Sequence, residues 1–259
     1  MKNTICLIGI GEMGGVFARG FLRVGFPVYP VTRGVNLKAA QEEIPDPLAV
    51  VVAVRENELA EVLQKIPEDW RDRLVLLQNE LLPHDWQAHN IINPTVISVW
   101  FEKKHPLDYK VIIPSPVYGP KSQLVSEALV SLKIPCKVLS NQEELLFELV
   151  LKNIYILTIN IAGLEVGGTV RELWTSHQPL ARAVADDILD IQFGLIRKSF
   201  DREQLIAGMV KTFTGDWEHK CLGRTALARL ERVLQQADEV GLSVNKLRGI
   251  SANQKAQAK

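Results

Sequence analysis

The chain is 259 residues long, enough for one large domain or two modest ones with a sizeable core. Its 30 basic residues balance 30 acidic ones, and this neutral charge gives no support to nucleic-acid binding or to a basic membrane surface. Three distant cysteines without a CxxC pair, and five histidines without metal-ligand spacing, predict reduced thiols and no metal site. With no signal-peptide pattern and no uncharged apolar stretch of about 18 residues, we expect a cytoplasmic protein without a membrane span.

Short apolar runs alternate with helical patterns over the first 140 residues. The order predicts strands at 4–9, 27–32, 48–54, 73–79, 95–101, 109–114 and 134–140, and helices near 13–25, 56–67 and 121–132. Continuous apolar strands alternating with helices favour a parallel sheet that is covered on both faces. We therefore expect an α/β domain of the Rossmann type over residues 1–140.

Strand patterns end near residue 141, and apolar residues then recur at helical spacing. The expected helices are 142–164, 179–200, 202–213 and 224–240, and the polar tail 251–259 is expected to be frayed. The sequence thus predicts an all-helical C-terminal domain over residues 141–259.

The stretch "LIGIGEMGGVFARG" contains Gly9-x-Gly11-x-x-Gly14 between the first strand and the first helix. In a dinucleotide-binding turn the first glycine allows the tight turn, the second admits a pyrophosphate, and the third lets helix and strand pack closely. The helix N-terminus adds free N–H groups and a positive dipole end. The motif therefore predicts a dinucleotide contact along Gly9, Ile10, Gly11, Glu12, Met13 and Gly14.

The residues at three strand ends refine this prediction. An enzyme that prefers NAD places an acid about 20 residues after the glycines, whereas this chain has Thr32 and Arg33, with no acid nearby in the sequence. An arginine fork suits a 2′-phosphate, so NADP(H) is the expected cofactor. Arg55 and Asn79 end the third and fourth strands, where they are candidates for ligand contacts or plain loop residues.

The stretch "ELVLKNIYILTINIAGL" carries polar residues in an apolar helix. At about 100° per residue, with Glu148 at zero, Lys152 falls near 40°, Asn160 near 120° and Asn153 near 140°, so the four share one arc. This arc is either a solvated stripe with an i,i+4 ion pair or the lining of a cleft. In a cleft, the lysine would protonate a carbonyl oxygen during hydride transfer, and Asn160 would orient the substrate.

The chain resembles the ketopantoate reductase (2-dehydropantoate 2-reductase) family over nearly its whole length. "IGIGEMGGVFA" is similar to the family's GxGxMGxxxA opening, "LLQNE" to its strand-end QNG, and "LKNIYILTINIAGLEVGGTVREL" to its lysine helix and following loop. The resemblance implies an NADPH-dependent reductase of pantothenate biosynthesis. It makes Lys152 the catalytic residue, Arg55 a cofactor contact, and Asn79 a contact of both cofactor and substrate.

The resemblance also identifies Asn160 and, from the count back from "GRTA", Thr214 as substrate-binding residues. Three positions depart from the family pattern: Ile161 replaces a proline, Ile156 replaces an asparagine, and Ala226 stands where the family has a substrate-binding glutamate. Asp216 or Glu218 are candidates to supply the missing carboxylate.

Three functions remain open at the level of sequence. The first is NADPH-dependent reduction of a ketopantoate-like 2-oxo acid by a monomer or homodimer, with Lys152 as general acid. The second is a non-catalytic NADP-binding sensor or regulatory protein on the same fold, motivated by Ala226 and Ile156. The third is a reductase of the wider β-hydroxyacid or pyrroline-carboxylate type, which the lysine helix disfavours.

Overall fold

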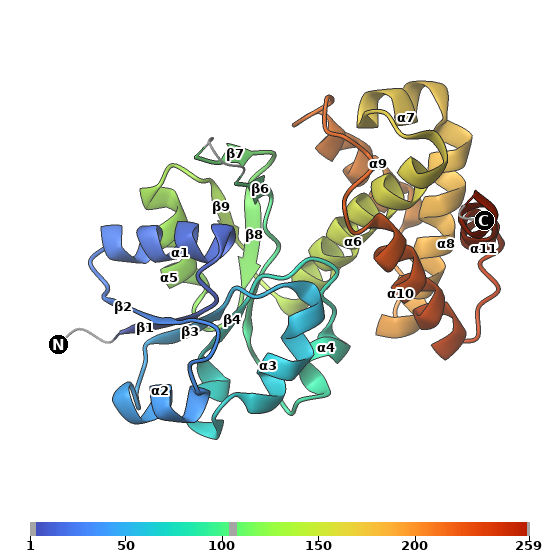
Figure 1. Ribbon diagram of the computed structural model, residues 1–259. Coiled ribbons are helices and arrows are strands. Elements are labelled where there is room, and N and C mark those ends of the chain that lie inside the picture. The colour runs from blue at the N-terminus through green and yellow to red at the C-terminus, as the bar shows by residue number, and fades with distance from the viewer. Residues whose placement is uncertain (1–3, 104–107, 258–259) are drawn as a thin grey trace. The chain divides into compact units, whose positions relative to one another are not determined.

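The computed structural model describes residues 4–103 and 108–257, which divide into two compact units. The first unit extends to Glu148 and the second begins at Leu149. The division therefore falls inside the long helix α6 (Gln142–Val166), eight residues after the end of the predicted first domain. Each unit has its own colours in Figure 1, blue to green for the first and yellow to red for the second.

A seven-stranded sheet of order β2-β1-β3-β4-β5-β8-β9 forms the centre of the first unit. Its strands are β1 (Ile5–Ile8), β2 (Val28–Val31), β3 (Ala49–Val52), β4 (Leu74–Leu76), β5 (Thr95–Ile97), β8 (Ser115–Tyr118) and β9 (Cys136–Val138). In β1 and β3 every residue is buried, as the continuous apolar runs predict for strands covered on both faces.

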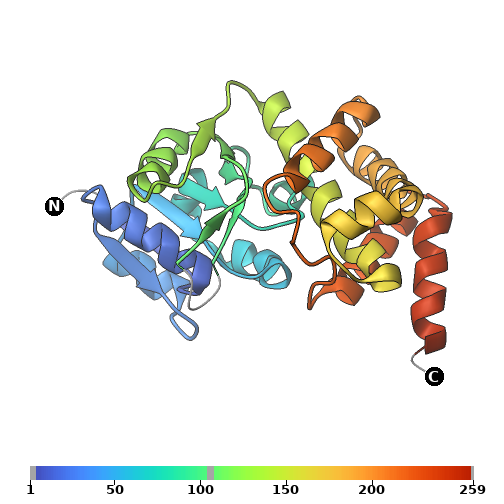
Figure 2. The same ribbon diagram turned by 90° about the horizontal axis from the view of Figure 1, so that it is seen from above.

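Helices cover both faces of this sheet. Figures 1 and 2 show α1 and α5 on one face and α2 and α3 on the other. The helical segments are α1 (Glu12–Arg23), α2 (Leu37–Glu43), the 3-10 turn η1 (Glu56–Glu58), α3 (Leu59–Lys65), the 3-10 segment η2 (Glu68–Arg73), α4 (Pro83–Gln87) and α5 (Ser122–Ser131). Gly20 of α1 lets the two helices of one face approach closely, because a Cβ there would lie 2.7 Å from the carbonyl oxygen of Ala128.

The prediction that all strands are parallel is wrong at one place. β8 pairs antiparallel with β5, while the other neighbouring strands of the sheet pair in parallel. Between them the chain forms the small antiparallel ribbon of β6 (Phe101–Glu102) and β7 (Lys110–Val111). A parallel neighbour needs a long crossover, usually a helix, whereas the described residues between β5 and β8 form this short ribbon, and β8 returns in the opposite direction.

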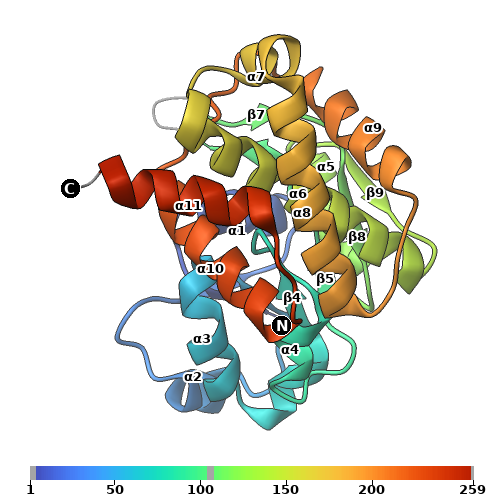
Figure 3. The same ribbon diagram turned by 90° about the vertical axis from the view of Figure 1, so that its right-hand side faces the viewer.

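The second unit is helical, as predicted. It contains most of α6, followed by α7 (Val170–Ser176), α8 (Gln178–Ile196), α9 (Arg202–Phe213), α10 (Ala226–Glu239) and α11 (Asn245–Gln257). α8 contacts α7, α9, α10 and α11, and Figure 3 shows it with α10 and α11 beside it. The expectation of a frayed tail is wrong for residues 251–257, which continue α11.

α6 is buried around most of its circumference. It is long and apolar enough to cross a membrane, but 83% of its most apolar window is buried inside the protein. A helix that is apolar on all sides and is packed within a protein is typical of a core. The polar side chains on α6 are therefore the exceptions that need a chemical explanation.

Candidate active site

Glycines shape the turn between β1 and α1. Gly9 has a φ of +92°, and a Cβ there would lie 2.7 Å from the carbonyl oxygen of Ala53. A Cβ on Gly14 would lie 2.0 Å from the carbonyl oxygen of Gly9, whereas one on Gly11 would meet no described atom within 4 Å. Close packing of the turn thus explains why positions 9 and 14 are glycine. The space at Gly11 is open, so a ligand could approach the backbone there.

A cavity of about 930 Å³ opens beside this turn. This volume lies in the upper part of the usual range for ligand pockets, about 300–1,000 Å³. The predicted cofactor residues that line it are Gly9, Ile10, Gly11, Thr32, Arg33 and Arg55. The cavity therefore joins the glycine turn to the ends of β2 and β3, which the sequence separates by more than 20 residues.

The other predicted residues of the motif lie in the first turn of α1. The carboxylate of Glu12 is 3.7 Å from the ammonium of Lys103, and Met13 packs against the core of the unit. Lys103 therefore reduces the negative charge at a helix end that is expected to receive a phosphate.

No acid lies close to Thr32 and Arg33 in the sequence, but Glu58, 25 residues after Arg33, reaches the end of β2 in the fold. Oε1 of Glu58 accepts hydrogen bonds from Nη2 of Arg55 at 2.6 Å and from Nη2 of Arg33 at 3.3 Å. Its other oxygen accepts from the backbone N–H of Arg55 at 3.2 Å. The side-chain hydrogen bond from Arg55 lowers the pKa of Glu58, so this carboxylate is ionised at neutral pH.

A second ion pair lines the same cavity. The ammonium of Lys65 is 2.6 Å from Oε1 of Glu61. Sequence reasoning missed Glu58, Glu61 and Lys65 as pocket residues. Their spacing of three and four residues would have placed them on one helix face, directly after the strand that ends near Arg55.

Asn79 stands apart from the described lining of the cavity. Its Nδ2 donates to Oε1 of Glu56 at 2.9 Å, which joins the carboxyl end of β4 to η1. The neighbouring Gln78 is buried and donates to the carbonyl of Val52 at 2.6 Å. At the position of the glycine in the QNG pattern, Glu80 has a φ of +62°, so the backbone keeps the left-handed conformation without the glycine.

Lys152 is buried in the helical unit, with 8% of its surface exposed. Its ammonium lies 5.9 Å from the ring centroid of Tyr155, within the range of a cation–π contact. Asn153, on the same predicted arc, instead serves the helix packing, since its Nδ2 donates to Oε1 of the buried Gln192 at 2.8 Å. The predicted arc therefore contains one structural amide beside the candidate catalytic lysine.

Asn160 is buried on α6 and is held by α10. Nη1 of Arg229 donates to Oδ1 of Asn160 at 2.9 Å, and a Cβ on Gly223 would lie 2.5 Å from the same oxygen. An arginine has only donors, so the oxygen of the amide faces Arg229 and its Nδ2 is the group left to donate elsewhere. Arg229 thus fixes which end of Asn160 is offered to a ligand.

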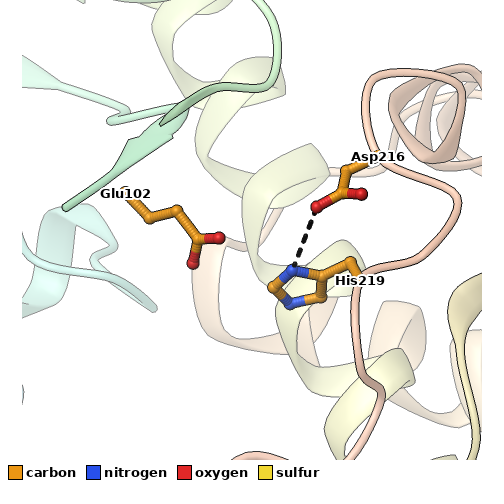
Figure 4. A group of neighbouring side chains, drawn as sticks. All are labelled: Glu102, Asp216 and His219. Carbon is orange, nitrogen blue, oxygen red and sulfur yellow. Dashed lines mark ion pairs between the residues drawn. The ribbon is translucent and has the colours of Figure 1, made fainter. Parts of the chain in front are cut away.

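The hydroxyl of Thr214 lies exposed at the C-terminus of α9 and donates to the carbonyl of Lys211 at 2.7 Å. Of the two acids expected to replace the missing carboxylate, Glu218 lies at the surface and pairs with Arg171 at 3.0 Å. Asp216 is more buried, and its carboxylate is 3.9 Å from Nδ1 of His219 (Figure 4).

The aromatic ring of Tyr155 lies near both Lys152 and the Asp216–His219 pair. The ring of Tyr155 lies 6.4 Å from that of His219 and 5.8 Å from that of Phe213, measured between centroids. Lys152, Tyr155 and His219 are therefore neighbours within the helical unit. The histidine spacings indicate no metal site, but the D-x-x-H spacing of Asp216 and His219 is a local signal that the two side chains can meet.

The cysteines take no part in these groups. Burial raises the pKa of Cys6 to about 12 and those of Cys136 and Cys221 to about 11. All three are free thiols. A thiol with so high a pKa is a poor nucleophile at neutral pH, so these residues are poor candidates for redox or nucleophilic chemistry.

The sheet and the helical second unit define a Rossmann-type α/β domain followed by an all-helical domain. Solved structures with this architecture include a probable 2-dehydropantoate 2-reductase from Bacillus subtilis, with a TM-score of 0.67 and 16% identity over 98% of this chain and 99% of that one. The 2-dehydropantoate 2-reductase from Methylococcus capsulatus has a TM-score of 0.70 and 11% sequence identity, over 98% of this chain and 96% of that one. D-mandelate dehydrogenase in complex with NADH has a TM-score of 0.69 and 13% sequence identity, over 98% of both chains.

No protein-family model and no curated protein matches the sequence. At identities of 11–16%, the structural likeness establishes the fold. Substrate and cofactor choice depend on the particular side chains of this chain.

Proposed function

We propose that this protein is an NADPH-dependent reductase of a 2-oxo acid. The observation that carries the proposal is the cavity at the glycine turn, which combines an open approach at Gly11 with two arginines at the strand ends. Pyrophosphate would bind at the N-terminus of α1, and a 2′-phosphate between Arg33 and Arg55. NADPH supplies a hydride, which reduces the C2 carbonyl of the substrate to an alcohol.

On the substrate side, Lys152 is assigned the role of general acid. The ammonium donates its proton to the carbonyl oxygen as negative charge develops there, which is a role of positioned acids in catalysis. Lys152 is largely buried, and an ammonium group supplies the N–H donors that this role requires.

Asn160, Thr214 and Asn79 are assigned to substrate binding. Because Arg229 binds the amide oxygen of Asn160, its Nδ2 donates to an oxygen of the keto acid, either the carboxylate or the carbonyl. Thr214 offers a hydroxyl, and Asn79 would also contact the cofactor. The expected assembly is a monomer or a homodimer, without nucleic acid or membrane.

A non-catalytic sensor on the same fold is the second candidate. Ala226 is buried at the first position of α10, and Ile156 is buried on α6. Apolar side chains thus replace two polar residues of the family pattern, of which the glutamate at position 226 is the one that the resemblance places at the substrate. The sensor hypothesis predicts NADPH binding without turnover.

The direct test follows NADPH oxidation at 340 nm with ketopantoate and a panel of branched and aromatic 2-oxo acids. The proposed function predicts steady turnover of at least one member, and the alcohol product is identified by mass spectrometry. Tight NADPH binding with no turnover across the panel would support the sensor hypothesis.

Arg229 provides a prediction on the substrate side. Replacing it with leucine removes the donor that orients Asn160, and we expect the KM for the 2-oxo acid to rise about tenfold, since such a hydrogen bond contributes roughly 1.5 kcal/mol. The Kd for NADPH is expected to stay unchanged in a fluorescence titration. Arg224→Leu removes the same charge from an exposed position just before α10 and should leave KM near the wild-type value.

A further inference from the structure

Resting on the proposed function, we propose that Glu58 sets the choice between NADH and NADPH. It is the acceptor for a ribose 2′-hydroxyl and the competitor of a 2′-phosphate in the same pocket. The pocket would then accept both dinucleotides, with Arg33 and Arg55 serving the phosphate and Glu58 serving the hydroxyl.

The carboxylate of Glu58 accepts hydrogen bonds from both Arg33 and Arg55. Glu58 Oε1 lies 2.6 Å from Nη2 of Arg55 and 3.3 Å from Nη2 of Arg33, and all three side chains line the cavity. Glu58 is fixed further by the backbone N–H of Arg55 at 3.2 Å. The acid is therefore held at the ends of β2 and β3, the edge at which a Rossmann-type domain binds the adenosine ribose.

These ion pairs contribute little to folding. The side chains of Arg33 and Arg55 are 84% and 65% exposed, and exposed ion pairs have small effects on stability. Their position in a pocket of alternating charge points to ligand recognition. Each guanidinium has several donors, so it can bind Glu58 and an incoming anion at different nitrogen atoms.

The two cofactors differ in what they require at this position. A ribose 2′-hydroxyl is a donor that an ionised carboxylate accepts strongly, whereas a 2′-phosphate carries about two negative charges and is repelled by the same carboxylate. Glu58 therefore contributes to NADH binding and reduces the preference for NADPH that Arg33 and Arg55 provide. It disfavours NADPH both by repulsion and by competing for the arginines.

The test compares Glu58→Gln with wild type by titrating each apoprotein with NADH and with NADPH and following nucleotide fluorescence. The glutamine keeps the size and removes the charge. We expect the Kd for NADPH to fall roughly fivefold and the Kd for NADH to rise by a similar factor, values expected from one exposed charge contact. Glu61→Gln is the matched control, because it removes a charge from the same cavity that is paired with Lys65.

The inference is overturned if the ratio of the two Kd values in Glu58→Gln stays within twofold of wild type, or if Glu61→Gln changes it equally. In those cases NADPH binding by wild type would leave the proposed function intact. If wild type binds neither dinucleotide, the cofactor half of the proposed function fails together with the inference. Circular dichroism of each variant confirms that the fold is retained.

Discussion

Replacing Lys152 with alanine is expected to reduce turnover of the 2-oxo acid by about 10²- to 10⁴-fold, the usual contribution of a positioned general acid. The Kd for NADPH should remain close to wild type, because the glycine turn and both arginines belong to the other unit. Single-turnover measurements with saturating NADPH separate the loss in chemistry from any change in substrate binding.

Two further variants make this result specific to the proton donor. Lys152→Met keeps a neutral side chain of similar length in this buried position, so it separates loss of the proton from creation of a cavity. Lys211→Ala removes an exposed lysine of the same unit and should retain full turnover. Wild-type turnover in Lys152→Met would remove the lysine from the mechanism.

Replacing Gly14 with alanine is expected to abolish dinucleotide binding. Its Cβ would lie 2.0 Å from the carbonyl oxygen of Gly9, so either α1 or the turn must shift away from the position that meets the pyrophosphate. We expect a Kd for NADPH at least 100-fold above wild type and a lower melting temperature, measured by titration and by differential scanning calorimetry.

The adjacent glycine provides the control for this change. A Cβ on Gly15 would meet no described atom within 4 Å, and alanine is favoured over glycine in a helix by about 1 kcal/mol. Gly15→Ala should therefore bind NADPH normally and melt at a slightly higher temperature. Equal behaviour of the two variants would show that close packing at Gly14 does not govern the site.

Secondary-structure elements that follow from local sequence patterns were predicted well, and features that depend on strand order were not. The glycine turn and most of the long helices follow from local patterns. β8 was missed because Pro116, which has no backbone N–H to donate, argues against a strand in the middle of a sheet. Its antiparallel direction depends on the ribbon that precedes it, which no local pattern specifies.

The same distinction applies to the candidate site. Glu58 follows Arg33 by 25 residues in the sequence, and the two side chains meet only because β2 and β3 flank β1 in the sheet. On α6, angular spacing grouped Asn153 with Lys152, although Asn153 contacts α8. Helical angle gives the direction of a side chain, and only the packed neighbours decide whether it meets protein or ligand.

Folding of the free chain does not require a glycine at position 11. The free protein has room for a side chain there, and the backbone, with φ −82° and ψ −164°, suits any residue. Serine or aspartate at this N-terminal cap would stabilise α1 by about 0.3 kcal/mol relative to glycine. Stability alone would thus not retain this glycine, whereas a phosphate resting on the backbone would. The proposed dinucleotide site therefore offers a reason for glycine at this position that folding of the free chain does not.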